Sequence, residues 1–278
     1  MFFAQLKNEL WKLFGKKRTY IGFGVFLVAQ AGMMLLFRYG PPSQGMARLL
    51  TNNGYVPDEF ISALTASLFM LVPQILFLMP LYVTLVGGDL VAKESEDGTL
   101  RMILSRPISR ARLLFVKWVA GIIFAILQVV SLGVIALIFA RILFPWKSMF
   151  VLDPDGGFAV FTAGEGFRRY VFAQLFMSVN ASVMLSIAFM FSCFNMKPAA
   201  STILALSYLL VNVVLENIPF FDHYDNWFVT HHFKGWLYLF RSPVPWPRIL
   251  ESEIILFAIC ATAFVVGRAI FQVRDIKS

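Results

Sequence analysis

The short charged segment 94–110 has a pattern of residues that predicts a turn followed by a helix. The dipeptide Asp97-Gly98 indicates a turn, and Thr99 can cap a helix that starts directly after it. Leu100, Ile103 and Leu104 lie three and four positions apart, so they share one face of this helix. The pattern therefore predicts a short helix with one apolar face, which starts directly after a turn.

The residues around this stripe complete a short rod with charged edges. Arg106-Pro107 is expected to end the helix, because the residue before a proline avoids helical backbone angles. Ser109 can cap the helix that follows. An ordinary basic loop between two membrane spans is the alternative, and these residues alone leave it open. The charged residues of the edges are Glu94, Glu96, Arg101, Arg106 and Arg110.

Residues that bind metals or catalyse reactions occur without the spacing that such sites need. His223, His231 and His232 lie near acidic residues but match no metal-ligand pattern. Asp153 begins a calcium-like loop, yet Gly164 stands at the twelfth position where a Glu is required. We expect no metal site and no cofactor in this chain. A membrane protease or acyltransferase is the enzyme alternative, but all three His lie outside the apolar runs, so we expect no enzyme activity.

An energy source is not apparent in the sequence. It contains no Gly-x-x-x-x-Gly-Lys-Ser/Thr phosphate loop, so ATP is not expected to bind by that route. No ionisable residue occupies the middle of an apolar run, which argues against a proton-driven carrier. Any process driven by ATP would therefore need a partner protein to hydrolyse it.

The composition places most of the chain in lipid. Of 278 residues, 59% are hydrophobic and 14% are charged, and the mean hydropathy is +0.73, whereas soluble domains carry about 25% charge. A membrane span needs roughly 20 apolar residues. The pattern predicts an all-α polytopic membrane protein that forms one domain over residues 1–278. The predicted spans are 19–37, 66–86, 118–140, 170–196, 198–215 and 254–271.

The net charge of +8 is better explained by a membrane than by nucleic acid. More than half of the 24 Lys and Arg residues fall on one side of the predicted spans, which the positive-inside rule assigns to the cytoplasm. We therefore expect a multi-pass protein of the plasma membrane with both termini in the cytoplasm and no nucleic-acid partner. The outer segments 38–65, 144–169 and 217–251 are expected to form short interfacial helices and turns.

The N-terminal residues 2–18 have apolar side chains at helical spacing, with lysines elsewhere on the helix. This pattern predicts an amphipathic helix that lies in the cytoplasmic membrane interface. A cleaved signal peptide is the alternative. However, the apolar run that follows continues to Phe37, which is longer than the apolar region of a typical signal peptide.

Amides and prolines are the main irregular features of the spans. The amides can hydrogen-bond between helices, which is the interpretation that we favour, or line a translocation path. Pro73 and Pro80 can make span two a hinge or a static bend. Pro198 is expected to begin a new helix after a tight turn. The candidate path residues are Gln74, Gln128, Gln174, Asn180 and Asn212.

The stretch 87–117 resembles the signature loop of the ABC-type-2 permease family. That family shows acidic residues before Gly-Thr-Leu, then Leu, Pro, a β-branched residue, Ser and Arg, and a Lys further on. Elsewhere only the six-span plan and the interfacial N-terminal helix agree with it. The matching positions are Glu94, Glu96, Gly98, Thr99, Leu100, Leu104, Pro107, Ile108, Ser109, Arg110 and Lys117.

The resemblance implies the membrane subunit of an ATP-driven ABC transporter. Segment 94–110 would be a coupling helix that sits in a groove of a separate ABC ATPase subunit, with Leu100, Ile103 and Leu104 as buried contacts. Export, and a second permease copy as a homodimer or a paired permease, are usual in the family. A membrane sensor or assembly factor that does not transport is the alternative. The residues assigned to ATPase coupling are Glu94, Glu96, Gly98, Thr99, Leu100, Arg101, Ile103, Leu104, Arg106, Pro107 and Arg110.

Overall fold

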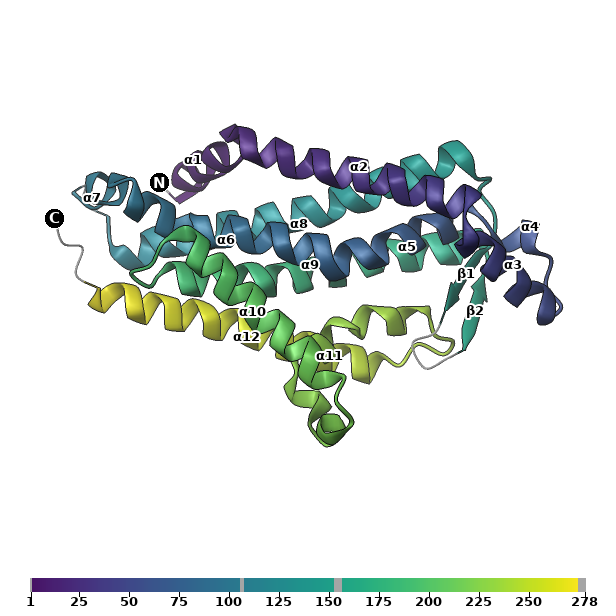
Figure 1. Cartoon of the computed structure of the whole chain (residues 1–278). Helices are drawn as coiled ribbons and strands as arrows, with labels where there is room; N and C mark the ends of the chain where they lie inside the picture. Colours follow the sequence, from purple (N-terminus) through teal and green to yellow (C-terminus); the bar gives the residue numbers. More distant parts are fainter. Residues whose placement is uncertain (1, 106–107, 153–156, 275–278) are drawn as a thin grey trace.

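Six long apolar helices form the body of the structure, a computed structural model (Figure 1). It describes residues 2–105, 108–152 and 157–274. Within these residues, six helical stretches are long and apolar enough to cross a membrane, which confirms the all-α polytopic prediction. They are α2 (Lys17–Tyr39), the joined stretch Ala63–Glu96, α8 (Arg110–Leu143), α9 (Ala163–Ser192), α10 (Pro198–Glu216) and α12 (Trp246–Val273).

The two ends of the bundle carry different short elements. Helix α1 (Phe2–Gly15), helix α7 (Thr99–Leu104) and the end of α12 lie at one end (Figure 1). Helices α3 (Pro41–Asn52) and α4 (Pro57–Phe60) lie at the opposite end with a β-hairpin. Between α10 and α12 the chain forms the 3₁₀ helices η2 (Pro219–Trp227) and η3 (Gly235–Phe240) on either side of α11 (Val229–Phe233).

The hairpin is the element that the sequence analysis did not expect. Strands β1 (Met149–Leu152) and β2 (Phe158–Phe161) pair antiparallel, with Met149 opposite Phe161. Aromatic and β-branched residues dominate both strands, a composition that favours extended backbone. The Phe150 N–H also donates to the Thr65 hydroxyl (2.9 Å), which fixes the hairpin to the start of the second span.

Helix α9 lies at the centre of the bundle and packs against α6 (Met79–Glu96), α8, α10 and α12. Small residues allow these helices to approach closely, as is common between helices in membranes. A Cβ atom on Gly87 of α6 would lie 2.7 Å from the Leu185 carbonyl oxygen of α9. A Cβ atom on Gly133 of α8 would lie 2.5 Å from the Gln174 amide. These glycines therefore set the spacing of α6 and α8 from α9.

The second span is broken by a π-helical turn. Helix α5 (Ala63–Pro73) leads into the π turn η1 (Gln74–Leu78), and α6 follows with Pro80 as its second residue. The Met79 N–H donates to the Gln74 carbonyl, five residues earlier. Pro80 has no N–H, so a regular α-helix could not form the hydrogen bond from this position to the carbonyl four residues earlier. The wider π turn therefore sacrifices little hydrogen bonding there.

The turn between α9 and α10 confirms Pro198 as a helix start, but the helix before it ends earlier than the predicted span 170–196. Helix α9 ends at Ser192, and Pro198 is the first residue of α10. The helices α8 and α12 begin earlier than the predicted spans. As a result, Lys117 and Glu253, which the sequence analysis placed just outside the apolar runs, lie on these helices with buried side chains.

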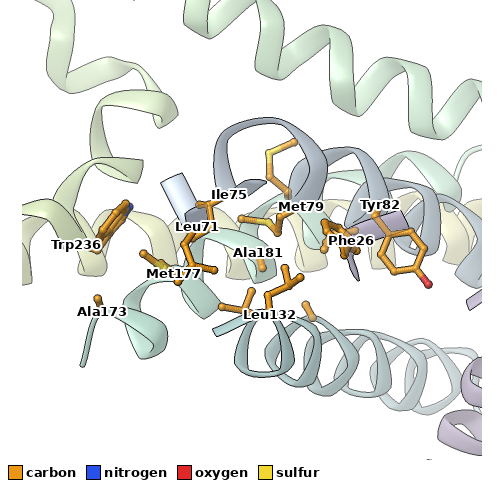
Figure 2. Close-up of a cluster of buried hydrophobic side chains, with 14 of the residues drawn as sticks. Phe26, Leu71, Ile75, Met79, Tyr82, Leu132, Ala173, Met177, Ala181 and Trp236 are labelled. Atoms are coloured by element: carbon orange, nitrogen blue, oxygen red, sulfur yellow. The ribbon is translucent and has the colours of Figure 1, made fainter. Parts of the chain in front are cut away.

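The apolar core runs along the bundle and joins the spans to the segment between α10 and α12. Figure 2 shows part of it, where the broken second span meets α9 and a tryptophan of η3. The labelled side chains are Phe26, Leu71, Ile75, Met79, Tyr82, Leu132, Ala173, Met177, Ala181 and Trp236.

Replacing Gly87 by leucine is expected to separate α6 from α9, because the new side chain meets the Leu185 backbone. Overpacking of this kind costs about 1–3 kcal/mol or more. Thermal loss of the monodisperse peak in detergent size-exclusion chromatography measures the effect. Gly24→Leu is the matched control, since a Cβ atom on Gly24 meets nothing within 4 Å. Equal melting of the two variants would contradict this view of the packing.

Candidate functional site

A glycine in the left-handed conformation stands directly before helix α7. Gly98 precedes α7 with φ of 71°, a backbone conformation that glycine adopts without strain. The predicted side-chain cap by Thr99 is wrong: Thr99 is the first helical residue, and its hydroxyl donates to the Glu94 carbonyl (3.2 Å). Thr99 therefore ties α7 back to α6. The predicted cap by Ser109 is confirmed, because its hydroxyl accepts from the Arg112 N–H (3.3 Å).

The apolar stripe of α7 faces the bundle. Leu100 is 1% exposed and belongs to the main core, while Ile103 and Leu104 are half-buried against it. Met102 is 66% exposed on the opposite side, next to the exposed Arg101. The outward surface of α7 is thus formed by Met102 and Arg101. Arg106 and Pro107, also assigned to coupling from sequence, lie outside the described residues.

Four charged residues meet where α1, α6 and α8 come together, and we call them the four-charge cluster. Lys117 of α8 lies 2.9 Å from a carboxylate oxygen of Glu9 in α1 and 2.7 Å from one of Glu94 in α6. Lys12 of α1 lies 2.8 Å from Glu9 and 3.2 Å from Glu94. The Lys117 side chain is 1% exposed. Each lysine therefore bridges both carboxylates, and the cluster joins three helices.

The cluster is charge-balanced, which a buried ion requires. Burial opposes the ionisation of Glu9, but Lys117 and Lys12 outweigh it and hold the pKa of Glu9 below its usual range. Burial also opposes the charge on Lys12, but hydrogen bonds and attraction to Glu9 and Glu94 raise its pKa. Both directions keep these two groups ionised at neutral pH.

A second set of contacts ties the end of α12 to the same region. Arg110, at the start of α8, donates to the carbonyl oxygens of Gln272 (3.2 Å) and Arg274 (3.0 Å). Arg274 in turn donates to the Ser95 hydroxyl (2.6 Å) and to the Asn195 side-chain oxygen (2.8 Å). The last turn of α12, whose carbonyls lack helical partners, is thereby held against α6, α8 and the α9–α10 turn.

The residues predicted as a charged rim therefore divide into two groups. Glu94 and Arg110 hold helices of the bundle together. Glu96 stays on the surface, where it pairs with Lys93 at 2.8 Å. Sequence analysis missed Glu9, although it is the sole acidic residue among the first 57 and stands in a strongly basic segment. A lone acid in such surroundings is the signal that could have indicated an internal ion pair.

Comparison with known proteins identifies the family. The model of the ABC-2 family transporter protein matches residues 7–222. The chain belongs to the ABC-2 family of transporter proteins. A curated relative, named as the probable ABC transporter permease protein NosY of Stutzerimonas stutzeri, is 34% identical over 80 residues. These residues cover 28% of this ABC-2 protein and 29% of the relative, so the chain spans less than a third of that relative's length.

The matched region of this ABC-2 protein runs from α1 into η2. It includes the four-charge cluster, the π turn and α7. The family resemblance read from residues 87–117 is therefore confirmed at the level of the family, and the chain is a multi-pass membrane protein.

The amides predicted as path residues are buried inside the chain. Asn180 donates to the Phe233 carbonyl (2.9 Å) and so joins α9 to α11. The Asn212 oxygen accepts from the Val229 N–H (3.1 Å). Gln30 of α2, an amide outside the predicted path, donates to the Leu132 carbonyl of α8 (2.9 Å). Such bonds hold segments together. Gln74, Gln128 and Gln174 are likewise buried.

An open groove lies on the surface instead. It has a volume of about 660 Å³ and is formed by α2, α6 and α10. Gly22 of α2, Tyr82 of α6, and Thr202 and Ile203 of α10 line it, together with the largely buried Asp89 of α6. The groove also reaches two lysines, Lys93 and Lys197. It combines an apolar wall with charged residues at one end.

The histidines between α10 and α12 have a structural arrangement. The His232 ring nitrogens lie 3.3 Å from the Ser252 hydroxyl and 3.0 Å from the Asn226 carbonyl oxygen. Burial lowers the pKa of His232, so the ring is neutral at neutral pH. Over the described part of the chain, no group of three His, Cys, Asp or Glu residues is placed to hold a metal ion.

Replacing Lys117 by methionine is expected to destabilise the bundle, because the Glu9 and Glu94 carboxylates then share only Lys12. Removing one partner of a buried ion pair costs about 3–5 kcal/mol. Unfolding by sodium dodecyl sulfate in mixed micelles measures the loss.

Lys93→Met is the control for that variant, since it removes a lysine that pairs on the surface, and its stability should match the unaltered chain. Adding Glu94→Gln to Lys117→Met should recover part of the stability, because the two charges that remain, Lys12 and Glu9, pair with each other at 2.8 Å. A Lys117→Met protein as stable as Lys93→Met would show that the cluster does not brace the helices.

Proposed function

We propose that this ABC-2 protein is the permease subunit of an ATP-driven ABC exporter and that α7 couples it to a separate ABC ATPase subunit. Both termini and α7 would face the cytoplasm, across the plasma membrane from the hairpin end. The observation that carries the proposal is the bracing of α7: a short helix at the end of the bundle whose outward side is accessible and whose inner side is buried. Export is proposed because it is the usual direction in the family that the signature loop resembles.

Helix α7 is well placed to pass on a movement. A push on Met102 would reach α6 through the Leu100 packing and through the Thr99 hydrogen bond to Glu94. Glu94 would pass it to α1 and α8 through the four-charge cluster. Rigid ion pairs move their helices together, so these three helices would respond as one body.

The π turn is the place where span two would bend. Its wider turn and its two flanking prolines weaken the regular hydrogen bonding between α5 and α6. Movement of α6 could therefore occur without an equal movement of α5. This supports the hinge interpretation of Pro73 and Pro80 over a static bend.

The cargo would pass beside this chain rather than through its middle. The buried amides fill the interior, whereas the groove of α2, α6 and α10 is open. The exposed apolar residues Ile21 and Ile203 flank it. A second copy of the chain packed over the groove would enclose a shared path and cover this surface. We therefore propose a homodimer with one ATPase subunit on each copy.

Replacing Met102 by aspartate should weaken association with the ABC ATPase subunit at least about tenfold, because a charge replaces an exposed apolar contact in a small docking surface. Co-purification with an ABC ATPase from the same genome measures this association. Val56→Asp, an equally exposed site between α3 and α4 at the other end of the bundle, is the control. If the unaltered chain retains no ATPase, or if both variants retain it equally, the coupling assignment fails.

Cysteine at position 203 should cross-link two copies in membrane vesicles treated with a short bis-maleimide. The native Cys193 and Cys260 are buried, so they should react little. Phe257→Cys on α12, also exposed but away from the groove, serves as the control. Cross-linking at position 257 but not at position 203 would contradict the proposal, because the dimer contact would then lie at α12 and not over the groove.

A further inference from the structure

A second, more enclosed cavity lies against the π turn. Its volume is about 160 Å³, and it is bounded by the broken second span, α9, α10, α11 and η3. Its lining includes Ile75 and Met79 of the broken span, Leu209 of α10 and Trp236 of η3. Ile75, Met79 and Trp236 are labelled in Figure 2. These four side chains are almost fully buried, so the walls are apolar and fixed by packing.

One polar group in the lining has no partner. Thr230 of α11 is 6% exposed, and its hydroxyl oxygen makes no hydrogen bond to any residue that the structure describes. A buried hydroxyl left unsatisfied costs about 1–3 kcal/mol. The neighbouring Asn180, by contrast, already donates to the Phe233 carbonyl. The Thr230 hydroxyl is therefore the group that a bound molecule would satisfy.

The rim of the cavity carries a closed ion pair. Lys234 lies 2.7 Å from a carboxylate oxygen of Glu216, whose side chain is largely buried. Because the two charges neutralise each other, the rim does not select for an acid or for an amine. A head group that is polar but uncharged suits these surroundings best.

We propose that this cavity binds a small amphipathic molecule with an uncharged hydroxyl-type head. The head would bond the Thr230 hydroxyl, and the apolar body would lie between Ile75, Met79, Leu209 and Trp236. An apolar cavity of roughly 150 Å³ accommodates a benzene-sized group, so the enclosed part of the body is a ring or a short alkyl segment. Because Ile75 belongs to the π turn, the bound molecule contacts the break in the second span. Binding requires neither ATP nor a second subunit, so it is independent of the proposed transport function.

Photolabelling of the purified full-length chain tests the proposal. The probes are octanol and octane, each carrying a diazirine, and mass spectrometry locates the label. The octanol probe should label the peptides that contain Ile75, Met79 and Trp236 more strongly than the octane probe. Competition by added phospholipid would identify a bilayer lipid as the natural occupant, and competition by free octanol alone would identify a free amphiphile.

Three variants separate binding in the cavity from labelling of the lipid-facing surface. Leu209→Trp fills the cavity and should reduce octanol labelling at least about tenfold, since no space remains. Leu210→Trp adds the same bulk at the neighbouring exposed position and should leave labelling unchanged. Thr230→Val should reduce octanol labelling about two- to twelvefold, the equivalent of one hydrogen bond, without changing octane labelling.

Labelling that is equal in the two tryptophan variants would overturn the cavity as the binding site. Equal labelling by octanol and octane in the unaltered chain, or octanol labelling unaffected by Thr230→Val, would overturn the assignment of a hydroxyl head. All of these readouts are independent of ATP hydrolysis, so failure here is distinct from failure of the transport proposal.

Discussion

The burial of one lysine ammonium constrains the whole α7 end of the bundle. An ion taken out of water needs opposite charge at contact distance, and Lys117 finds it in Glu9 and Glu94. Those carboxylates belong to α1 and α6, so satisfying Lys117 also fixes where α1 lies and how α6 ends. Lys12 balances the second negative charge. The position of α7 then follows, because Thr99 bonds the Glu94 carbonyl.

Away from this end, the bundle depends on small residues and on hydrogen bonds instead of charge. Lipid tails are as apolar as the side chains, so helices in a membrane gain little from hiding apolar surface and associate through close packing. Gly87 and Gly133 let α6 and α8 approach α9. Asn180 and Asn212 fasten the segment between α10 and α12 to the spans. The four-charge cluster thus stabilises the α7 end of the bundle, and these contacts stabilise the rest of it.

The features predictable from sequence are those set by local pattern. Apolar run length located the six spans, Pro198 marked the start of α10, and Ser109 marked the start of α8. Features that depend on distant partners were missed. Nothing near Thr99 indicates that its hydroxyl bonds Glu94, and the spacing of Leu100 reveals an apolar face without saying whether that face packs inward.

The π turn also has a geometric consequence for the direction in which α7 points. A π turn holds one residue more than an α turn, so converting it to a regular helix would rotate α6 by about 100° relative to α5 and shift it by about 1.5 Å. Everything fixed to α6, including Glu94, would be carried round with it. Pro80 opposes that conversion, since a regular turn would call for an N–H that proline lacks. Pro80 thus helps to set the direction that the end of α6 nearest α7 faces.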